Sequence, residues 1–227
     1  MSVVKMENAV KTYKVGKVEV PALRGLTLSI EKGEFTAIAG PSGSGKTTLL
    51  NLFGCLDKPT SGKVFIEEHD IIKLNSDQLA DVRNHHIGFI FQSFNLVPVL
   101  TAYENVEFPL VLLKELPAHR KTRVMEMLES VGIGDLASRR PNEMSGGQQQ
   151  RVAIARALVK HPDYVLADEP TANIDTKTGQ GILDLMKEMN QKLKTTFIFS
   201  THDPKVMQFA RRLIKIRDGQ IESDEKQ

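Results

Sequence analysis

The segment that most restricts the fold of this chain is Gly-Pro-Ser-Gly-Ser-Gly-Lys-Thr-Thr at residues 40–48. It follows a short apolar run ending at Ala39, and from Lys46 to Leu56 the apolar residues return at helical spacing. Glycines here let the backbone curl until several N–H groups point to one place, and a helix start adds partial positive charge. The segment therefore predicts a phosphate-binding loop between a buried strand and a helix.

The residue types in this loop indicate how a nucleoside triphosphate would be held. Lys46 would reach the β- and γ-phosphates, and Thr47 would place its hydroxyl on Mg²⁺. The alternative interpretation is an ordinary glycine-rich turn, which the flanking strand and helix patterns disfavour. The expected nucleotide contacts in the loop are Gly40, Pro41, Ser42, Gly43, Ser44, Gly45, Lys46, Thr47 and Thr48.

Two acidic residues follow the apolar run Tyr-Val-Leu-Ala at residues 164–167. At the carboxyl end of a parallel strand, Asp168 and Glu169 would face the same crevice as the phosphate loop. Asp168 would hold Mg²⁺ directly or through water, because hard cations favour carboxylate oxygen. Glu169 would orient and deprotonate an attacking water. The alternative for such a pair is a solvated loop or a helix cap.

A second glycine-rich helix start lies about a hundred residues after the first, in Glu-Met-Ser-Gly-Gly-Gln-Gln-Gln at residues 143–150. The unpaired N–H groups at a helix start form an anion site. The residues alone leave open whether this site serves a separate anion or whether the glycines form only a flexible turn.

Together these motifs resemble the ATP-binding cassette (ABC) family of transporter ATPases. Ser145, Gly146, Gly147 and Gln148 are similar to its signature motif, although Met144 stands where leucine is commoner. Four further positions match family elements in the family's order, so that the resemblance spans nearly the whole chain. They are Tyr13 for the aromatic residue that stacks on adenine, Gln92 for the Q-loop, Asp175 for the D-loop and His202 for the switch histidine. Ala172 departs from the usual glycine or serine.

The resemblance implies an ATPase that uses ATP and Mg²⁺. Its catalytic residues would be Glu169, His202 and Gln92, and its metal-binding residues Thr47, Gln92 and Asp168. The signature residues and Asp175 would serve the ATP held by a second copy, giving an ATP-dependent homodimer with each ATP between two chains.

The implied fold is α/β: a P-loop NTPase core with a mostly parallel sheet, an N-terminal antiparallel β subdomain and an inserted α-helical subdomain. Residues 1–227 form one ABC ATPase domain, in which 1–92 and 160–227 make the core with the antiparallel subdomain, and 93–159 make the helical subdomain carrying the signature motif. Local patterns add a buried strand face at Leu26, Leu28 and Ile30, and a helix capping box at Thr101 and Glu104.

Near its end the chain shows a hairpin signal at Asp218-Gly219, and we expect the tail after it, Ser-Asp-Glu-Lys-Gln at residues 223–227, to be frayed and exposed. Cys55, the single cysteine, suits a reducing compartment and is expected as small core filler. His69, His85 and His86 show no convincing ligand spacing.

Length, charge and hydropathy indicate which partners and which cellular location to expect. The chain has 227 residues and a net charge of +2, so its charge gives no support for nucleic-acid binding. It lacks a secretory signal and the ~18 uninterrupted apolar residues of a membrane span. We therefore expect a cytoplasmic protein.

A single cassette without a membrane span implies a separate permease, which would attach the chain to the cytoplasmic face of the inner membrane. The apolar segment at residues 93–113 lies where the family receives its membrane partner. The sequence looks most like the branch of lipoprotein-release, macrolide-export and cell-division ATPases, whose permeases have large extracytoplasmic domains. The cargo stays open.

Three other classes of protein are alternatives to a transporter subunit. One is a soluble ABC ATPase of DNA repair or the ribosome, but such proteins carry a long coiled coil or two cassettes. Another is a P-loop kinase or GTPase, for which the Asn-Lys-x-Asp guanine motif is missing and the signature motif is unexplained. The third is a regulatory ATP-dependent clamp of a cell-division-type permease.

Overall fold

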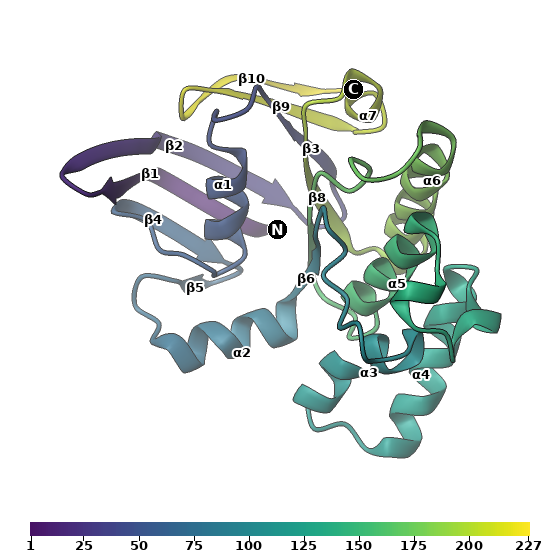
Figure 1. The fold of residues 1–227 in the computed structure, drawn as a ribbon. Helices are drawn as coiled ribbons and strands as arrows, with labels where there is room; N and C mark the ends of the chain where they lie inside the picture. The colour runs from purple at the N-terminus through teal and green to yellow at the C-terminus, as the bar shows by residue number, and fades with distance from the viewer.

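The computed structural model describes residues 1–227 and is organised around a six-stranded sheet (Figure 1). The order across this core sheet is β10-β9-β3-β8-β7-β6. Five of its strands are parallel, and β10 pairs antiparallel to β9 at one edge. The strands are β3 (Phe35–Ala39), β6 (Ile87–Ile90), β7 (Tyr164–Asp168), β8 (Thr196–Thr201), β9 (Arg212–Arg217) and β10 (Gln220–Lys226).

A second sheet of four antiparallel strands lies beside the core sheet. Its order is β2-β1-β4-β5, with β1 (Ser2–Val15), β2 (Val18–Glu31), β4 (Ser61–Ile66) and β5 (His69–Asp70). The predicted alternation holds in β2, because Leu26, Leu28 and Ile30 are all buried. Both sheets and their relation match the α/β class with an antiparallel subdomain that the sequence predicts.

Helices separate the two sheets on one side and cover the core sheet on the other. Helix α1 (Lys46–Phe53) contacts strands of both sheets, and α2 (Ser76–His86) leads into β6. The group on the opposite face contains α3 (Ala102–Leu112), α4 (Pro117–Ser130), α5 (Gly146–Leu158) and α6 (Thr176–Leu193), with the short turns η1 (Gly134–Leu136) and η2 (Pro141–Glu143) and a short α7 (Pro204–Met207) before β9 (Figure 1). Helices α3 to α5 lie within the predicted helical subdomain; its limits at 93 and 159 stay a prediction.

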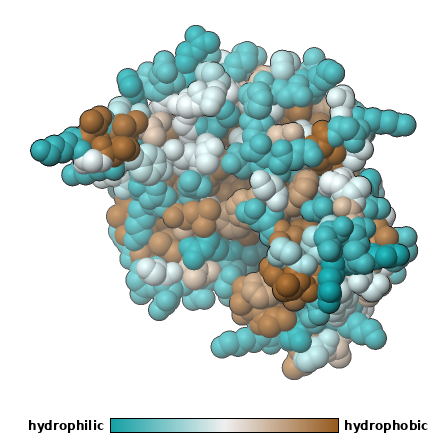
Figure 2. Space-filling view, in the orientation of Figure 1, coloured by the Kyte–Doolittle hydropathy of each residue, from teal (hydrophilic) through white to brown (hydrophobic).

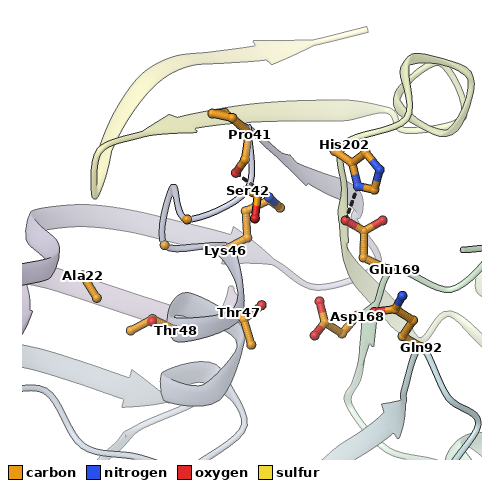
Figure 3. A pocket seen from close by; sticks show the side chains of 12 residues that line it. Ala22, Pro41, Ser42, Lys46, Thr47, Thr48, Gln92, Asp168, Glu169 and His202 are labelled. Carbon is orange, nitrogen blue, oxygen red and sulfur yellow. Dashed lines mark hydrogen bonds and ion pairs between the residues drawn. The ribbon is translucent and has the colours of Figure 1, made fainter. Parts of the chain in front are cut away.

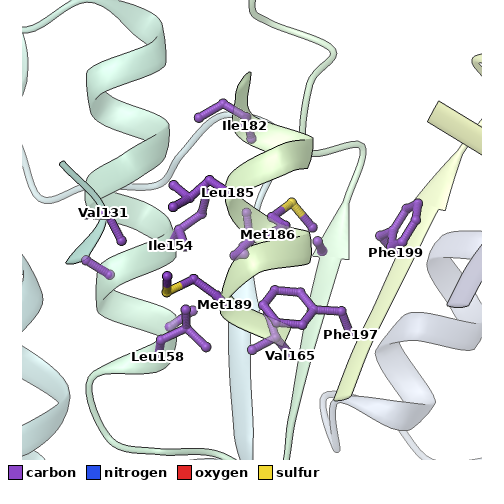
Figure 4. Close-up of a cluster of buried hydrophobic side chains, with 14 of the residues drawn as sticks. Val131, Ile154, Leu158, Val165, Ile182, Leu185, Met186, Met189, Phe197 and Phe199 are labelled. Carbon is purple, nitrogen blue, oxygen red and sulfur yellow. The ribbon is translucent and has the colours of Figure 1, made fainter. Parts of the chain in front are cut away.

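Alternate residues of the core strands point into two separate hydrophobic clusters. In β8, Phe197 and Phe199 belong to a cluster of 31 buried residues under the helices, whereas Ile198 belongs to a cluster of 25 facing the antiparallel sheet. Figure 4 shows the first cluster, where Ile154 and Leu158 of α5 meet Met186 and other residues of α6. Burial on both faces explains why these strands are almost entirely apolar in sequence.

Two sequence predictions were wrong at the ends of elements. Helix α1 stops at Phe53 instead of Leu56, because Gly54 follows and Cys55 turns into the left-handed region at φ 52°. The amide of Leu56 then donates to the carbonyl of Asn51, which is the hydrogen bond of a Schellman helix end. Cys55 is buried as predicted.

The second error concerns the tail, which is part of β10 up to Lys226 instead of frayed chain. Asp224 accepts two hydrogen bonds from Arg212 on β9, at 2.8 Å from Nε and 2.7 Å from Nη2. The hairpin turn at Asp218-Gly219 and the capping box at Thr101 and Glu104 are confirmed. None of the helices combines the length and apolar character that crossing a bilayer requires.

Candidate active site

The phosphate loop has the strand, loop and helix context that the sequence predicts. It runs from Ala39, where β3 ends, to Lys46, where α1 begins. Gly45 adopts φ 105°, which side chains rarely tolerate, and a Cβ there would lie 2.6 Å from the carbonyl oxygen of Ala22. A Cβ at Gly40 would lie 2.2 Å from the carbonyl oxygen of Ile216. These close backbone approaches fix the loop against β2 and β9.

The ammonium group of Lys46 lies over the turn of this loop. Its Nζ donates to the carbonyl oxygens of Gly40 at 2.7 Å and Pro41 at 2.9 Å. An ammonium carries three N–H donors, so one remains for a further acceptor. The loop thus presents a fixed positive charge beside the first turn of α1.

The two acidic residues stand at the carboxyl end of β7, and a serine on the neighbouring strand connects them. Ser200 of β8 is fully buried, and its hydroxyl donates to Asp168 Oδ1 at 2.5 Å. The Ser200 hydroxyl oxygen also accepts a hydrogen bond from the backbone N–H of Glu169 at 3.1 Å. Glu169 itself has φ 48°, a left-handed conformation that is uncommon outside glycine. Ser200 therefore fixes the carboxylate of one acidic residue and the backbone of the other.

His202, just past the end of β8, reaches the second acidic residue. Its Nδ1 lies 2.7 Å from Glu169 Oε1 (Figure 3). The histidine side chain is 68% exposed, whereas that of Glu169 is only 16% exposed. The contact holds the glutamate carboxylate at the wall of the cavity.

These groups surround a cavity of about 530 Å³. In Figure 3 the loop residues and Thr47 form one wall, and Asp168, Glu169, Gln92 and His202 form the other. Most of the lining side chains are polar, and they carry charges of both signs. The lining residues are Ala22, Pro41, Ser42, Gly43, Gly45, Lys46, Thr47, Thr48, Gln92, Asp168, Glu169 and His202.

The other predicted site residues lie outside this lining. Gly40 and Ser44 belong to the loop but face into the protein, where the Ser44 hydroxyl is buried without a hydrogen-bond partner. Tyr13 of β1 donates its hydroxyl to Asp57 at 3.0 Å, and burial together with that carboxylate raises the pKa of Tyr13. Adenine stacking by this ring stays a prediction.

The signature residues begin α5, away from the cavity. Ser145 is the N-cap: its Oγ accepts from the Gln148 amide at 3.4 Å, and the Gln148 side chain accepts from the Ser145 amide at 2.8 Å. Ser145 is exposed, whereas Gly147 is buried, and a Cβ at Gly147 would lie 2.3 Å from Cγ2 of Thr178 on α6. The second glycine thus has a packing reason that the sequence interpretation did not include.

Asp175 also has a local role. It is the N-cap of α6, where its side chain accepts from the Thr178 amide at 3.0 Å. Its hydrogen bonds to Thr178 lower the pKa of Asp175. Helix capping alone is therefore a sufficient reason for an aspartate at position 175, and a contact of Asp175 with a second chain stays a prediction.

Several residues that sequence reasoning missed join the site to the signature helix. Gln150 of α5 is fully buried, and its Nε2 donates to the carbonyl of Pro170 at 2.6 Å, directly after the acidic pair. Asn173 donates to the carbonyl of Gln92 at 3.0 Å, and Arg156 of α5 donates to the carbonyls of Asn95 and Phe94. Gln150 ends the segment 143–150, but no role was predicted for any of these three residues. Their partners lie 20 to 81 positions away, so no local signal could reveal these contacts.

A phosphate loop at a helix start and an acidic pair at the carboxyl edge of the same parallel sheet define a P-loop nucleoside triphosphatase. The chain belongs to the ABC transporter family, whose sequence model matches residues 23–172, more than half of the chain. It is an ATPase of a transporter.

Three comparisons describe its relatives. A Thermotoga maritima protein described as an uncharacterized ABC transporter ATP-binding protein is 50% identical over 216 residues, 95% of this chain and 92% of the relative. The macrolide export ATP-binding/permease protein MacB of Syntrophobacter fumaroxidans is 45% identical over 226 residues, 99% of this chain but 32% of that protein. The dimeric post-hydrolysis state of the ATP-binding cassette MJ0796, from Methanocaldococcus jannaschii, bound to ADP and Pi, is 47% identical, with a TM-score of 0.90 and 98% of each chain covered.

Proposed function

We propose that this chain is the separate ATP-hydrolysing subunit of a membrane transporter, that two copies close around two ATP molecules, and that closure drives a permease of the lipoprotein-release or macrolide-export type. The observation that carries the proposal is the single cavity in which the phosphate loop, Gln92, both acidic residues and His202 converge. ATP would lie with its phosphates in the loop and its β–γ bond toward Glu169.

Within this cavity the residues divide the work of hydrolysis. Glu169 would accept the proton of the attacking water, since its carboxylate lines the cavity beside His202. His202 would orient Glu169 and contact the γ-phosphate, and Gln92 would align the water from the other wall. Lys46 would neutralise the phosphates with its remaining N–H. Phosphoryl transfer needs positioning and charge stabilisation more than covalent chemistry, and this lining supplies both.

The cavity also offers a donor set that fits Mg²⁺. Thr47 and Asp168 approach the cavity from opposite walls, and Gln92 lies near Asp168 (Figure 3). Hydroxyl, carboxylate and amide oxygens are the ligands that this hard cation prefers. When bound, Mg²⁺ would neutralise charge on the phosphate oxygens. Ser200, by fixing the Asp168 carboxylate, would keep one ligand preorganised.

Dimerisation is supported by the place of the signature residues. Ser145 is exposed at the start of α5 but does not line its own chain's cavity, so its hydroxyl O–H and the unpaired N–H groups that follow it in the first turn suit an anion held by another molecule. The relative MJ0796 is described as dimeric with ADP and Pi. In a head-to-tail dimer the γ-phosphate would join the two chains, and its hydrolysis would weaken the interface.

The permease would dock on the apolar surface around α3, which we call the α3 surface. It comprises the exposed residues Val97, Val99, Phe108, Val111, Leu112 and Leu116. Figure 2 shows brown side chains gathered on this lower part of the molecule. Neighbouring α3 residues such as Val106 and Leu110 are buried, so the predicted segment 93–113 splits into core and surface. Such an exposed patch is typical of an interaction site.

The relatives named MacB carry an ATP-binding part and a permease in one protein, of which this chain matches about a third. We infer that here the permease is a separate chain, with extracytoplasmic domains, and that it holds the ATPase at the cytoplasmic face of the membrane. Co-purification from membranes after mild detergent extraction tests this. A stable companion would identify the permease and its cargo class, and recovery of the chain only from ribosomes or DNA would refute the transporter role.

The hydrolytic part is tested with Glu169→Gln, which should keep ATP binding and lower turnover by roughly 10²–10⁴-fold. Its closed dimer should persist with ATP and elute earlier in gel filtration than the nucleotide-free protein. Glu188→Gln, an exposed substitution on α6, is the matched control and should leave both properties unchanged. Near-normal hydrolysis by Glu169→Gln would remove Glu169 from its role.

The dimer is tested by adding Ser145→Arg to the Glu169→Gln protein. The arginine side chain would block the anion site at the start of α5 without touching the cavity of its own chain. ATP binding by the monomer should be unchanged while the ATP-dependent dimer is lost. A dimer that forms as before would show that this helix start does not face a second nucleotide.

A further inference from the structure

Three possible metal ligands meet at the edge of the core sheet opposite the nucleotide cavity. Glu67 lies in the turn between β4 and β5, His86 is the last residue of α2, and Asp163 directly precedes β7. One ligand atom from each lies within 4.8 Å of the other two. The sequence places these residues far apart and shows no convincing ligand spacing for His86; the fold brings the three side chains together.

The closeness of two of these residues follows from the register of the sheet. Ile87 of β6 pairs with Tyr164 of β7 in parallel, so His86 and Asp163, one residue earlier in each strand, start side by side. His86 Nδ1 lies 2.7 Å from Asp163 Oδ2. Backbone pairing therefore keeps these two residues adjacent, and their side-chain rotamers complete the contact.

The charges at this point favour a cation. Two carboxylates converge on one imidazole, and the nearby Lys32 ammonium is 3.7 Å from Asp163 and 62% exposed, so it can move away. The side chains of His86 and Asp163 are only 34% and 25% exposed, which limits screening by water. Imidazole nitrogen with carboxylate oxygen is a donor set that Zn²⁺ and its neighbours accept, whereas Mg²⁺ and Ca²⁺ prefer oxygen alone.

Zinc–ligand bonds of about 2.0–2.2 Å in a tetrahedron place the donors roughly 3.3–3.5 Å apart. Around a bound ion the 2.7 Å contact between His86 and Asp163 would widen, and the other ligand distances already lie within 4.8 Å. A neighbouring cavity of about 220 Å³, which His69 and His85 also line with His86, gives access from solvent. His85 is already engaged, since its Nδ1 donates to the Asp81 carbonyl at 2.9 Å.

We propose that Glu67, His86 and Asp163 form a binding site for a divalent transition-metal ion, with Zn²⁺ the best match, that is separate from the nucleotide site. The ion would join the β4–β5 turn of the antiparallel sheet to the start of β7 in the core sheet. Water or His69 would complete the coordination. Zinc would therefore stabilise the relation between the two sheets.

The test is titration of the purified full chain with ZnCl₂ by calorimetry, together with thermal unfolding in zinc and in EDTA. The wild type should bind zinc and unfold at a higher temperature with it. His86→Ala and Asp163→Asn should weaken zinc binding by more than the roughly 10–100-fold typical of losing an outer-shell partner, and should remove the zinc-dependent rise. His85→Ala is the matched control and should behave as wild type.

Two further variants keep the outcome decisive. Glu67→Gln changes an exposed turn residue, so it folds even if changes at His86 or Asp163 disturb the core, and it should also weaken zinc binding at least tenfold. His202→Ala is the control for zinc that binds at the nucleotide cavity, because His202 lines that cavity and would be a ligand there. Zinc binding that disappears in His202→Ala but is unchanged in Glu67→Gln and His86→Ala would overturn the proposal, as would no zinc binding by the wild type.

Discussion

Replacing Ser200 by alanine is the sharpest test of how the site is organised. The Ser200 hydroxyl holds the Asp168 carboxylate and accepts the Glu169 amide, yet it does not line the nucleotide cavity. Ser200→Ala therefore removes no expected ligand contact. The substitution leaves the Asp168 carboxylate free to rotate, and it leaves the part-buried backbone N–H of Glu169 without a hydrogen-bond acceptor. The change should alter the positions of both acidic residues while leaving the phosphate loop unchanged.

The size of the effect follows from the hydrogen bonds lost. A hydrogen bond to a charged group contributes about 1.5–3 kcal/mol, and each 1.36 kcal/mol is tenfold in rate. If the loss falls on the transition state, kcat should fall by about 10- to 150-fold. The Mg²⁺ concentration for half-maximal activity should rise, because one ligand is no longer preorganised. ATP affinity measured without Mg²⁺ should change little.

The assay is steady-state ATP hydrolysis as a function of ATP and Mg²⁺, with thermal unfolding measured in parallel. Thr196→Val is the matched control: Thr196 is fully buried on the same strand, and its hydroxyl accepts the Gly33 amide at 2.9 Å at the opposite end. Both variants should lose comparable stability, of about 1–3 kcal/mol, but only Ser200→Ala should lose turnover. Equal kcat values for Ser200→Ala and wild type, or equal losses in both variants, would refute the positioning role.

Two other predictions concern packing and pH. Gly147→Ala should destabilise the protein by about 1–3 kcal/mol, because the added Cβ would meet Cγ2 of Thr178 at 2.3 Å. Adding Thr178→Ser to this variant removes that methyl group and should restore part of the lost stability in denaturant unfolding. A double variant no more stable than Gly147→Ala would contradict the close packing of α5 on α6. The Arg212 hydrogen bonds lower the pKa of Asp224, so this carboxylate stabilises the fold above its unfolded pKa of about 3.9, and the contribution is lost as the pH falls through its folded value. In urea unfolding, Asp224→Asn should cost up to about 1 kcal/mol at pH 7, and this difference should shrink as the pH falls through the lowered pKa of Asp224. A difference that does not depend on pH would assign the loss to packing.

The parts of the site that could be predicted are those made by adjacent residues. The phosphate loop, Lys46 and Thr47 form within one strand, loop and helix unit, and Asp168 with Glu169 directly ends an apolar strand. Local chain geometry places such groups, so their pattern in the sequence is enough. Gln92 and His202 were predicted only through their place in the family's order of motifs, and the structure brings both to the same cavity.

The parts that could not be predicted depend on strand order and long-range contact. Ser200 meets Asp168 because β8 lies beside β7 in the sheet, although 32 residues separate them. Gln150 reaches Pro170 because α5 packs near the end of β7. The same holds for the tail: Asp224 becomes part of a strand only when Arg212 of β9 is beside it.

The sequence by itself determined the phosphate loop and the apolar faces, because each depends on residues within a few positions of one another and on periods of two or 3.6. The α/β class followed from the resemblance of its motifs to the ABC family. The tertiary structure decided which distant side chains meet: Ser200 with the acidic pair, Gly147 against Thr178, and Glu67, His86 and Asp163 at one sheet edge. Such meetings depend on the order and register of strands and on how closely helices pack. Those are properties of the whole folded chain, since they result from burying two hydrophobic clusters at once.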